Sequence, residues 1–193
     1  LCLMAMVMVA CDPVETEPEH IDYVSQLKLD MTSSSLKIEN VKVKQYIDGD
    51  TTHFYVPESV IDKGILKARY IAINTPESTG QIEEWGKKAS NFTKTKLQAA
   101  TSIILESDTD ALNVDSTGDR HLIWVWYKTA DSAEYRNLNL EILQEGLAIA
   151  SSSSQNRYGS ICMNAIDQAK AHKLYVYSGE DDPDFYYGSA IEL

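Results

Sequence analysis

The sequence predicts a small domain of the α+β class, and three observations lead to this prediction. Between residues 41 and 73, apolar and polar residues alternate in short segments, which is the period of a half-buried strand. An Asp-Gly pair separates the first two segments and is typical of a β-hairpin. After residue 80 the apolar residues change to helical spacing. A chain of 193 residues is long enough for one such domain with tails.

The local pattern then predicts each element in turn. Strands are expected over residues 41–47, 51–56, 65–73, 102–107 and 120–127. Pro76 ends the third strand, because proline has no N–H to donate to a β-ladder. Helices are expected over residues 81–100, 137–146 and 158–173, the first with Ile82, Trp85, Ala89, Phe92 and Leu97 on its apolar face. Gly146 closes the second helix.

The net charge of −12 is unusual for a nucleic-acid-binding protein, which is normally basic. The acidic residues are, however, concentrated in the tails. Residues 1–36 carry six acids and one lysine, and residues 179–193 carry five acids and no basic residue. The central residues 37–178 hold 16 basic and 18 acidic residues. A polyanionic substrate is therefore not excluded, although non-specific attraction to it should be weak.

The first ten residues are apolar and are followed by Cys11. About 20 apolar residues are needed to span a bilayer, so this run has the length of a signal-peptide core instead. Met-Val-Ala-Cys resembles the lipobox of bacterial lipoproteins, whose cysteine becomes lipidated. We therefore expect a signal-peptide remnant over 1–11, with a membrane anchor at Cys11 rather than a transmembrane helix. A buried strand with an incidental cysteine is the alternative.

Polar tails are expected on both sides of the domain. Residues 12–36 are interpreted as a polar linker, and residues 179–193 as an acidic linker that can lead to a C-terminal domain beyond this sequence. The folded domain is then expected over 37–178. The three cysteines form no disulfide framework, and we expect Cys162 to be a small core residue rather than a catalytic thiol.

Polar residues gather where the predicted strands end. Carboxylates, an amide and a turn rich in carbonyls are found at Asp48, Asp50, Asn74 and Thr75, and such oxygen atoms suit Ca²⁺. Two arginines on strands can clamp a phosphate and stabilise the charge that develops there. A further carboxylate, Glu77, can activate a water molecule. Together these groups suit phosphodiester hydrolysis.

Each of these features also has an ordinary structural explanation. Asp-Gly-Asp is common in turns, and Thr-Pro-Glu is a common helix start. An arginine on a strand is often solvated or ion-paired, and Arg120 lies close in sequence to Asp115 and Asp119. The order and spacing of the features, taken together, favour the functional interpretation.

That joint pattern resembles the thermonuclease family, whose type member is staphylococcal nuclease. The matching segments are Ile47-Asp48-Gly49-Asp50-Thr51, Arg69, Asn74-Thr75-Pro76-Glu77, Trp85-Gly86, Asp115 with Gly118-Asp119-Arg120, Gly146-Leu147-Ala148, and DQAKAHKLYVYS over 167–178. They cover about residues 38–178 in a single order. The resemblance implies a five-stranded OB-fold β-barrel with three helices, Ca²⁺-dependent nuclease activity, and DNA or RNA as substrate for a monomeric protein.

The resemblance also implies roles for individual residues. The implied Ca²⁺ ligands are Asp50, Asn74 and Thr75; the implied catalytic residues are Arg69, Glu77 and Arg120; the implied supporting residues are Asp48 and Thr51. Glu77 would act as the general base or orient water, and the two arginines would contact the scissile phosphate.

Three departures from the family pattern affect these expectations. Asn74 replaces the second metal-binding carboxylate, so Ca²⁺ affinity should fall while an oxygen ligand remains. Asp119 is inserted beside Arg120, where it can offset or turn the arginine. Residues 149–156 contain serines in place of substrate-stacking tyrosines, and Ser116 and Thr117 replace a lysine and a tyrosine of a nearby loop.

Three functions follow from this sequence. The first is a cell-surface, Ca²⁺-dependent nuclease of a bacterium, tethered by a lipid and acting on nucleic acid outside the cell. The second is a catalytically weakened nuclease-fold module that binds nucleic acid or a protein partner, which Asn74, Asp119 and the missing tyrosines favour. The third is a lipoprotein domain in which the barrel is only a scaffold.

Overall fold

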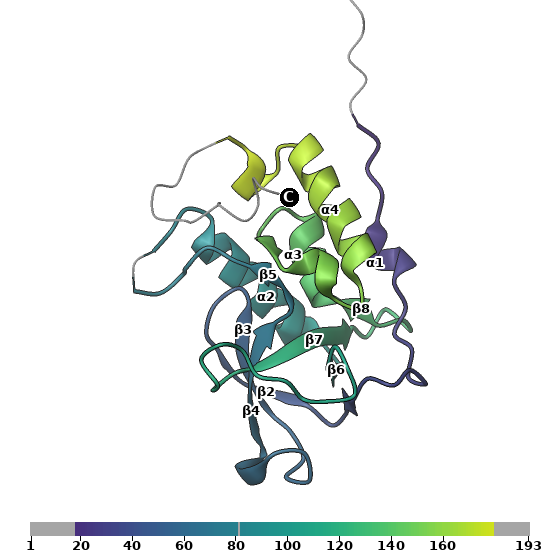
Figure 1. The fold of residues 1–193 in the computed structure, drawn as a ribbon. Coiled ribbons are helices and arrows are strands. Elements are labelled where there is room, and N and C mark those ends of the chain that lie inside the picture. Colours follow the sequence, from purple (N-terminus) through teal and green to yellow (C-terminus); the bar gives the residue numbers. More distant parts are fainter. Residues whose placement is uncertain (1–17, 81, 180–193) are drawn as a thin grey trace, which may run out of the picture.

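A mixed β-sheet forms the centre of the molecule in the computed structural model, which describes residues 18–80 and 82–179 (Figure 1). The main sheet has the order β1-β6-β7-β4-β3-β2, and β8 pairs with β7. Its strands are β1 (Lys37–Ile38), β2 (Lys42–Tyr46), β3 (Thr51–Tyr55), β4 (Ile65–Tyr70), β6 (Ser102–Glu106), β7 (His121–Lys128) and β8 (Arg136–Asn137). A two-stranded sheet pairs β5 (Ala72–Asn74) with β9 (Ile149–Ser151).

The helices are α1 (Tyr23–Gln26), α2 (Gly86–Ala99), α3 (Leu138–Gln144) and α4 (Gly159–Ala171). Short 3₁₀ turns lie at η1 (Asp62–Gly64), η2 (Ser153–Gln155) and η3 (Tyr175–Tyr177). The five expected strands correspond to β2, β3, β4, β6 and β7, which are consecutive neighbours in one sheet. The three expected helices correspond to α2, α3 and α4. The prediction of an α+β domain is therefore confirmed.

The middle of β7 is buried on both faces, and the large residues Trp124 and Trp126 are fully enclosed. A buried asparagine joins this strand to α3: the Asn139 side chain accepts a hydrogen bond from the Val125 amide at 2.9 Å. It also donates to the carbonyl of Ile123 at 3.0 Å. Buried backbone groups must find partners, and the Asn139 side chain supplies them to two backbone groups of β7 where α3 packs on the sheet.

The expected strand over 65–73 is divided into two in the structure. Ile71 donates its amide hydrogen to the carbonyl of Ile123, and Ala72 then adopts a left-handed backbone conformation with φ 72°. The chain leaves the main sheet at this point and pairs with β9 instead of continuing along β4. This break directs Asn74 and the residues after it toward the turn between β2 and β3.

Helix α2 begins later than expected, at Gly86 rather than near residue 81. Trp85 has a left-handed φ of 62°, which interrupts helical geometry just before this start. A Cβ at Gly86 would lie 2.0 Å from the Glu77 carbonyl oxygen, so only glycine fits here. Ile82 is 53% exposed and does not belong to the buried face.

The segment 20–36 is anchored to the domain at several points, which the interpretation of residues 12–36 as a polar linker did not anticipate. The Val24 side chain is 1% exposed. The Gln168 side chain accepts from the Ile21 amide at 2.7 Å and donates to its carbonyl at 2.9 Å, which ties the segment to α4. Polar composition predicted a solvated chain here, but a few apolar residues and two distant glutamines, Gln168 and Gln144, anchor it.

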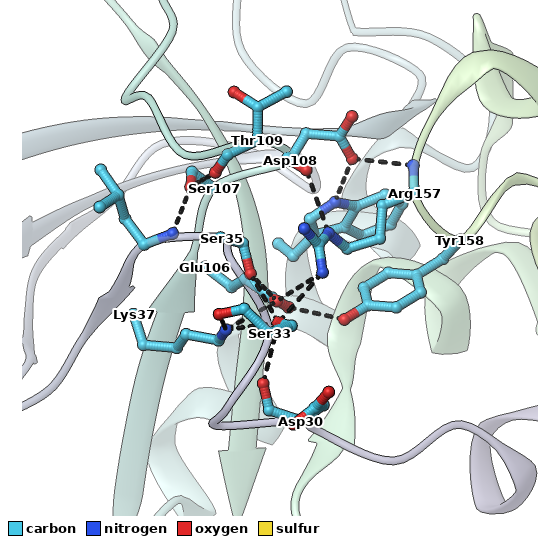
Figure 2. Close-up of polar contacts among 12 residues, drawn as sticks. Asp30, Ser33, Ser35, Lys37, Glu106, Ser107, Asp108, Thr109, Arg157 and Tyr158 are labelled. Atoms are coloured by element: carbon cyan, nitrogen blue, oxygen red, sulfur yellow. Dashed lines mark hydrogen bonds and ion pairs between the residues drawn. The ribbon is translucent and has the colours of Figure 1, made fainter.

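A buried carboxylate also holds this segment. Figure 2 shows Glu106, which is fully buried at the end of β6 and accepts hydrogen bonds from Ser35 and Tyr158. Lys37 and Arg157 lie within 4 Å of its oxygen atoms and balance its charge. Because a buried carboxylate is costly without partners, this cluster fixes the N-terminal segment, β6 and the start of α4 relative to one another.

Some expectations concern residues outside the described part of the chain. Cys11, the signal-peptide remnant and the acidic residues 180–193 are among them. Cys162 is described and fully buried, and burial raises the pKa of its thiol to about 12, so its assignment to the core is confirmed. In the residues that are described, no helix is both long and apolar enough to cross a membrane.

The packing of the N-terminal segment predicts a stability loss in Val24→Ala. Removing two buried methyl groups should lower the free energy of unfolding by about 2 kcal/mol. Val60→Ala is the matched control, since Val60 is 38% exposed in a loop and its truncation should have little effect. Urea denaturation of both variants measures the difference. Equal stabilities would mean that the segment does not pack on the domain in solution.

Candidate active site

The turn between β2 and β3 carries the buried carboxylate of Asp50, which is 1% exposed. One of its oxygens, Oδ2, accepts a hydrogen bond from the Thr75 amide at 2.9 Å. The other, Oδ1, accepts from the Thr51 hydroxyl at 3.0 Å and forms an ion pair with Arg69. This single carboxylate therefore joins the β2–β3 turn, β4 and the segment that follows β5.

The β-ladder explains why Arg69 reaches this carboxylate. Thr51 and Arg69 are direct partners in the antiparallel pairing of β3 with β4, so the arginine lies beside the turn. The Arg69 guanidinium also donates to the Asn74 side-chain oxygen at 2.7 Å. Oxygens of Asp50 and Asn74 thus converge on one guanidinium group.

Asp48 lies at the start of the same turn and accepts a hydrogen bond from the Asp50 amide at 3.1 Å. Burial raises the pKa of the Asp48 carboxyl to about 7, and the nearby negative charge of Asp50 adds to this effect. Glu77 contributes a smaller rise, which places its charge near the turn. Two carboxylates and a third acidic group therefore compete for positive charge at this site.

The turn is packed tightly against α2, and this packing requires glycine at position 49. A Cβ at Gly49 would lie 2.8 Å from the Thr75 side chain and 2.9 Å from Ala89. The Thr93 hydroxyl, also on α2, donates to the Gly49 carbonyl at 2.6 Å. The helix thus fixes the position of the acidic turn from behind.

Glu77 lies in the loop between β5 and α2, and its side chain is exposed. Its amide donates to a carboxylate oxygen of Glu83 at 2.6 Å, and its carbonyl accepts from the Glu83 amide at 2.9 Å. These two hydrogen bonds hold the loop between residues 77 and 83 in a closed turn. The Glu77 carboxylate faces solvent beside the site.

Arg120 comes from the loop before β7 and pairs with Asp115, with Nε 2.7 Å from Oδ2. Asp119, which we expected to offset Arg120, instead binds Lys67 through both carboxylate oxygens at 2.6 and 2.8 Å. Parallel pairing of β4 with β7 explains the difference, since it brings His121 opposite Ala68, one residue from Lys67. The inserted acid therefore leaves Arg120 facing the site.

Arg69 and Arg120 line one cleft of about 310 Å³. Its other polar lining residues are Asp115, Ser116, Ser151, Ser152 and Asn156. The sequence pattern did not identify Asn156 as a lining residue, because the pairing of β5 with β9 that brings it there joins distant parts of the chain. The structure thus brings Asp50, Arg69, Asn74 and Thr75 into direct contact, with Arg120 across the cleft.

The oxygen atoms at this site are of the kinds that a hard cation such as Ca²⁺ accepts. No group of three His, Cys, Asp or Glu side chains that could hold a metal ion occurs within residues 18–80 and 82–179. Calcium, however, also accepts amide and backbone carbonyl oxygens, which Asn74 and Thr75 can supply next to Asp50. In this structure the Arg69 guanidinium contacts Oδ1 of Asp50 and the side-chain oxygen of Asn74, so a metal ion would have to share these oxygens with Arg69 or displace it.

Comparison with known families identifies the family to which this chain belongs. The model of the staphylococcal nuclease homologue family matches residues 67–178, which is more than half of the chain. The chain therefore belongs to the staphylococcal nuclease family and has its α+β, OB-type fold. No curated protein matches the chain.

The raised pKa of Asp48 predicts a pH dependence of stability. The folded state holds this proton more tightly than the unfolded state, whose aspartates titrate near 3.8. The stabilisation is therefore complete below the unfolded value and is lost as pH rises through about 7.

In the presence of chelator, Asp48→Asn should flatten this decline in the free energy of unfolding. The exposed residue Asp62 provides the matched control, and Asp62→Asn should keep the slope of the unmodified chain. Urea denaturation at several pH values measures the slopes. The explanation fails if the free energy of unfolding of Asp48→Asn declines with pH as steeply as that of the unmodified protein.

Proposed function

We propose that the protein is a Ca²⁺-dependent phosphodiesterase that hydrolyses DNA or RNA outside the cell. The observation that carries this proposal is the convergence of two arginines, Arg69 and Arg120, on one cleft beside the buried Asp50 carboxylate. A cleft with two guanidinium groups and adjoining oxygen ligands suits a negatively charged phosphate. Membership in the staphylococcal nuclease family supports the same reaction class.

In the proposed mechanism, Asp50, Asn74 and Thr75 would hold Ca²⁺, which would supply positive charge to the phosphate. Arg69 and Arg120 bind the phosphate oxygens and stabilise the additional negative charge of the transition state. Glu77 accepts a proton from the attacking water, whose oxygen bonds to phosphorus. The phosphorus–oxygen bond to the leaving group breaks, and the leaving oxygen takes a proton from solvent to form the alcohol.

The proposed environment of the enzyme rests on the sequence. The apolar run that ends at Cys11 supports a lipid anchor and a place on the bacterial cell surface. The near-neutral charge of residues 37–178 supports weak long-range attraction to nucleic acid, so the cleft itself has to supply most of the grip.

Substitution of Glu77 tests the catalytic part of the proposal. Glu77→Gln keeps the shape of the side chain and removes its basicity, so Ca²⁺-dependent cleavage of single-stranded DNA and RNA should fall by about 10²- to 10⁴-fold. Binding of the same strands should change little. Cleavage with Ca²⁺ and with chelator is followed on gels.

Glu39→Gln is the control, since Glu39 is exposed in the turn between β1 and β2. It should cleave as the unmodified protein does. Absence of Ca²⁺-dependent cleavage in the folded, unmodified chain would contradict the proposed enzyme activity.

Asn74→Asp tests the ligand assignment. A carboxylate at this position adds negative charge beside Asp50, so Ca²⁺ should bind roughly tenfold tighter or better. Calorimetric titration of Ca²⁺ measures the affinity, with Asn91→Asp on the exposed side of α2 as the matched control. Equal affinities for Asn74→Asp and the unmodified chain would exclude Asn74 from the site.

The alternative is a nuclease-fold module that binds nucleic acid or a protein partner without cleaving it. The ion pair of Arg120 with Asp115 favours this function, because it partly neutralises one of the two phosphate-binding groups. Strand binding without Ca²⁺-dependent cleavage, equal in Glu77→Gln and the unmodified chain, would support the alternative.

A further inference from the structure

The cleft between Arg69 and Arg120 is lined by polar side chains and by the apolar residues Ile71, Ala72, Ile73 and Leu122. The first three of these apolar residues are buried, so the exposed part of the wall is mainly polar. Ser116, Ser151 and Ser152 are exposed and contribute hydroxyl groups. Asn156 contributes an amide. Such groups donate and accept hydrogen bonds and offer no flat apolar surface to a nucleobase.

Tyr70 is the single aromatic residue among the described residues that line this cleft. Its ring is not available for stacking, because the residue is 1% exposed and its hydroxyl lies 2.9 Å from the Thr52 hydroxyl. The next aromatic residue along the chain from the serine loop, Tyr158, packs on Trp124 and Trp126 with ring centroids 5.0 and 5.8 Å apart. Its hydroxyl donates to the buried Glu106, so this ring also faces the core.

The serine-rich wall is held in place from several sides. Ser153 is buried, and its hydroxyl donates to the Ala72 carbonyl across the β5–β9 pair. Arg157, which ends this loop, donates from its amide to Asp108 at 3.0 Å and from its guanidinium to Ser33 at 3.1 Å (Figure 2). The polar character of the wall is therefore built into the folded domain.

The size of the cleft also favours a small polar ligand group. A volume of about 310 Å³ lies at the lower end of the range for small-ligand sites, roughly 300–1,000 Å³. Because two guanidinium groups line the cleft, most of this space suits a phosphate and the sugar attached to it.

We infer that this cleft recognises the sugar-phosphate backbone of its substrate and not the bases, so phosphodiesters without bases are also bound and hydrolysed. The inference rests on the proposed function, since it concerns the same cleft. A stacked base contributes roughly 5- to 140-fold in affinity elsewhere. The absence of an available ring in the described lining predicts that this preference is missing here.

Binding of two fluorescent single strands to the full chain in Ca²⁺ tests the inference. Both strands have about eight nucleotides, one with ordinary bases and one with tetrahydrofuran abasic units at every position. Fluorescence anisotropy should give dissociation constants that agree within about threefold. An ordinary strand bound tenfold tighter or more, or no binding of either strand, would overturn the inference.

Cleavage of the same strands is scored separately. If neither strand is cleaved while both bind equally, the proposed hydrolysis fails and backbone recognition stands. If the ordinary strand alone is cleaved and bound, the hydrolysis stands and backbone recognition fails.

A gain-of-function variant makes the test specific to this cleft. Ser151→Tyr places a ring at the exposed end of β9, so the ordinary strand should then bind at least fivefold tighter than the abasic strand. Ser59→Tyr is the control, since Ser59 is exposed in the loop before β4, whereas Arg69 lies near the other end of that strand. If the ratio of the two dissociation constants is unchanged in a folded Ser151→Tyr variant, the strand does not bind in this cleft and the inference is overturned.

Discussion

The buried carboxylate of Asp50 is the constraint on which the site depends. A buried charge is expensive unless it is paired and hydrogen-bonded, with effective penalties of several kcal/mol. Asp50 meets this requirement with the Thr75 amide, the Thr51 hydroxyl and the Arg69 guanidinium. These partners come from the β2–β3 turn, from β4 and from the segment after β5. Stabilising one charge therefore brings together the same groups that we propose bind a metal ion and a phosphate.

Two buried carboxylates in this protein show how environment decides their use. Glu106 is surrounded by Ser35, Tyr158, Lys37 and Arg157, which satisfy it within the protein (Figure 2). The Asp50 carboxylate pairs with an arginine that also lines an open cleft. Glu106 therefore stabilises the fold. A ligand that binds Arg69 in the cleft would change the ion pair of Asp50 as well. The Glu106 cluster still serves the site, because Arg157 anchors the serine-rich wall.

Much of this arrangement could be predicted from the sequence. The Asp-Gly turn was predicted between β2 and β3, where the structure has it, and it carries Asp50. The separate pairing of β3 with β4 puts Thr51 opposite Arg69, which places the arginine beside Asp50. The serine-rich stretch already indicated a wall without stacking rings. The remaining features depend on contacts between distant segments. The parallel pairing of β4 with β7 brings Lys67 within reach of Asp119. The left-handed backbone of Ala72 divides a stretch that its apolar residues had indicated to be one strand. The packing of Val24 was hidden in a polar segment whose composition resembles a linker.

The central claim, that the oxygens around Asp50 hold Ca²⁺, is tested most directly by an NMR titration of the full chain with Ca²⁺. The Thr75 amide donates to the Asp50 carboxylate, so its signal reports on any change at that group. We predict that the largest saturable shifts occur at the amides of Asp50 and Thr75 and at the Nε of Arg69. Saturable shifts confined to other acidic residues, or no shifts at millimolar Ca²⁺, would contradict this account.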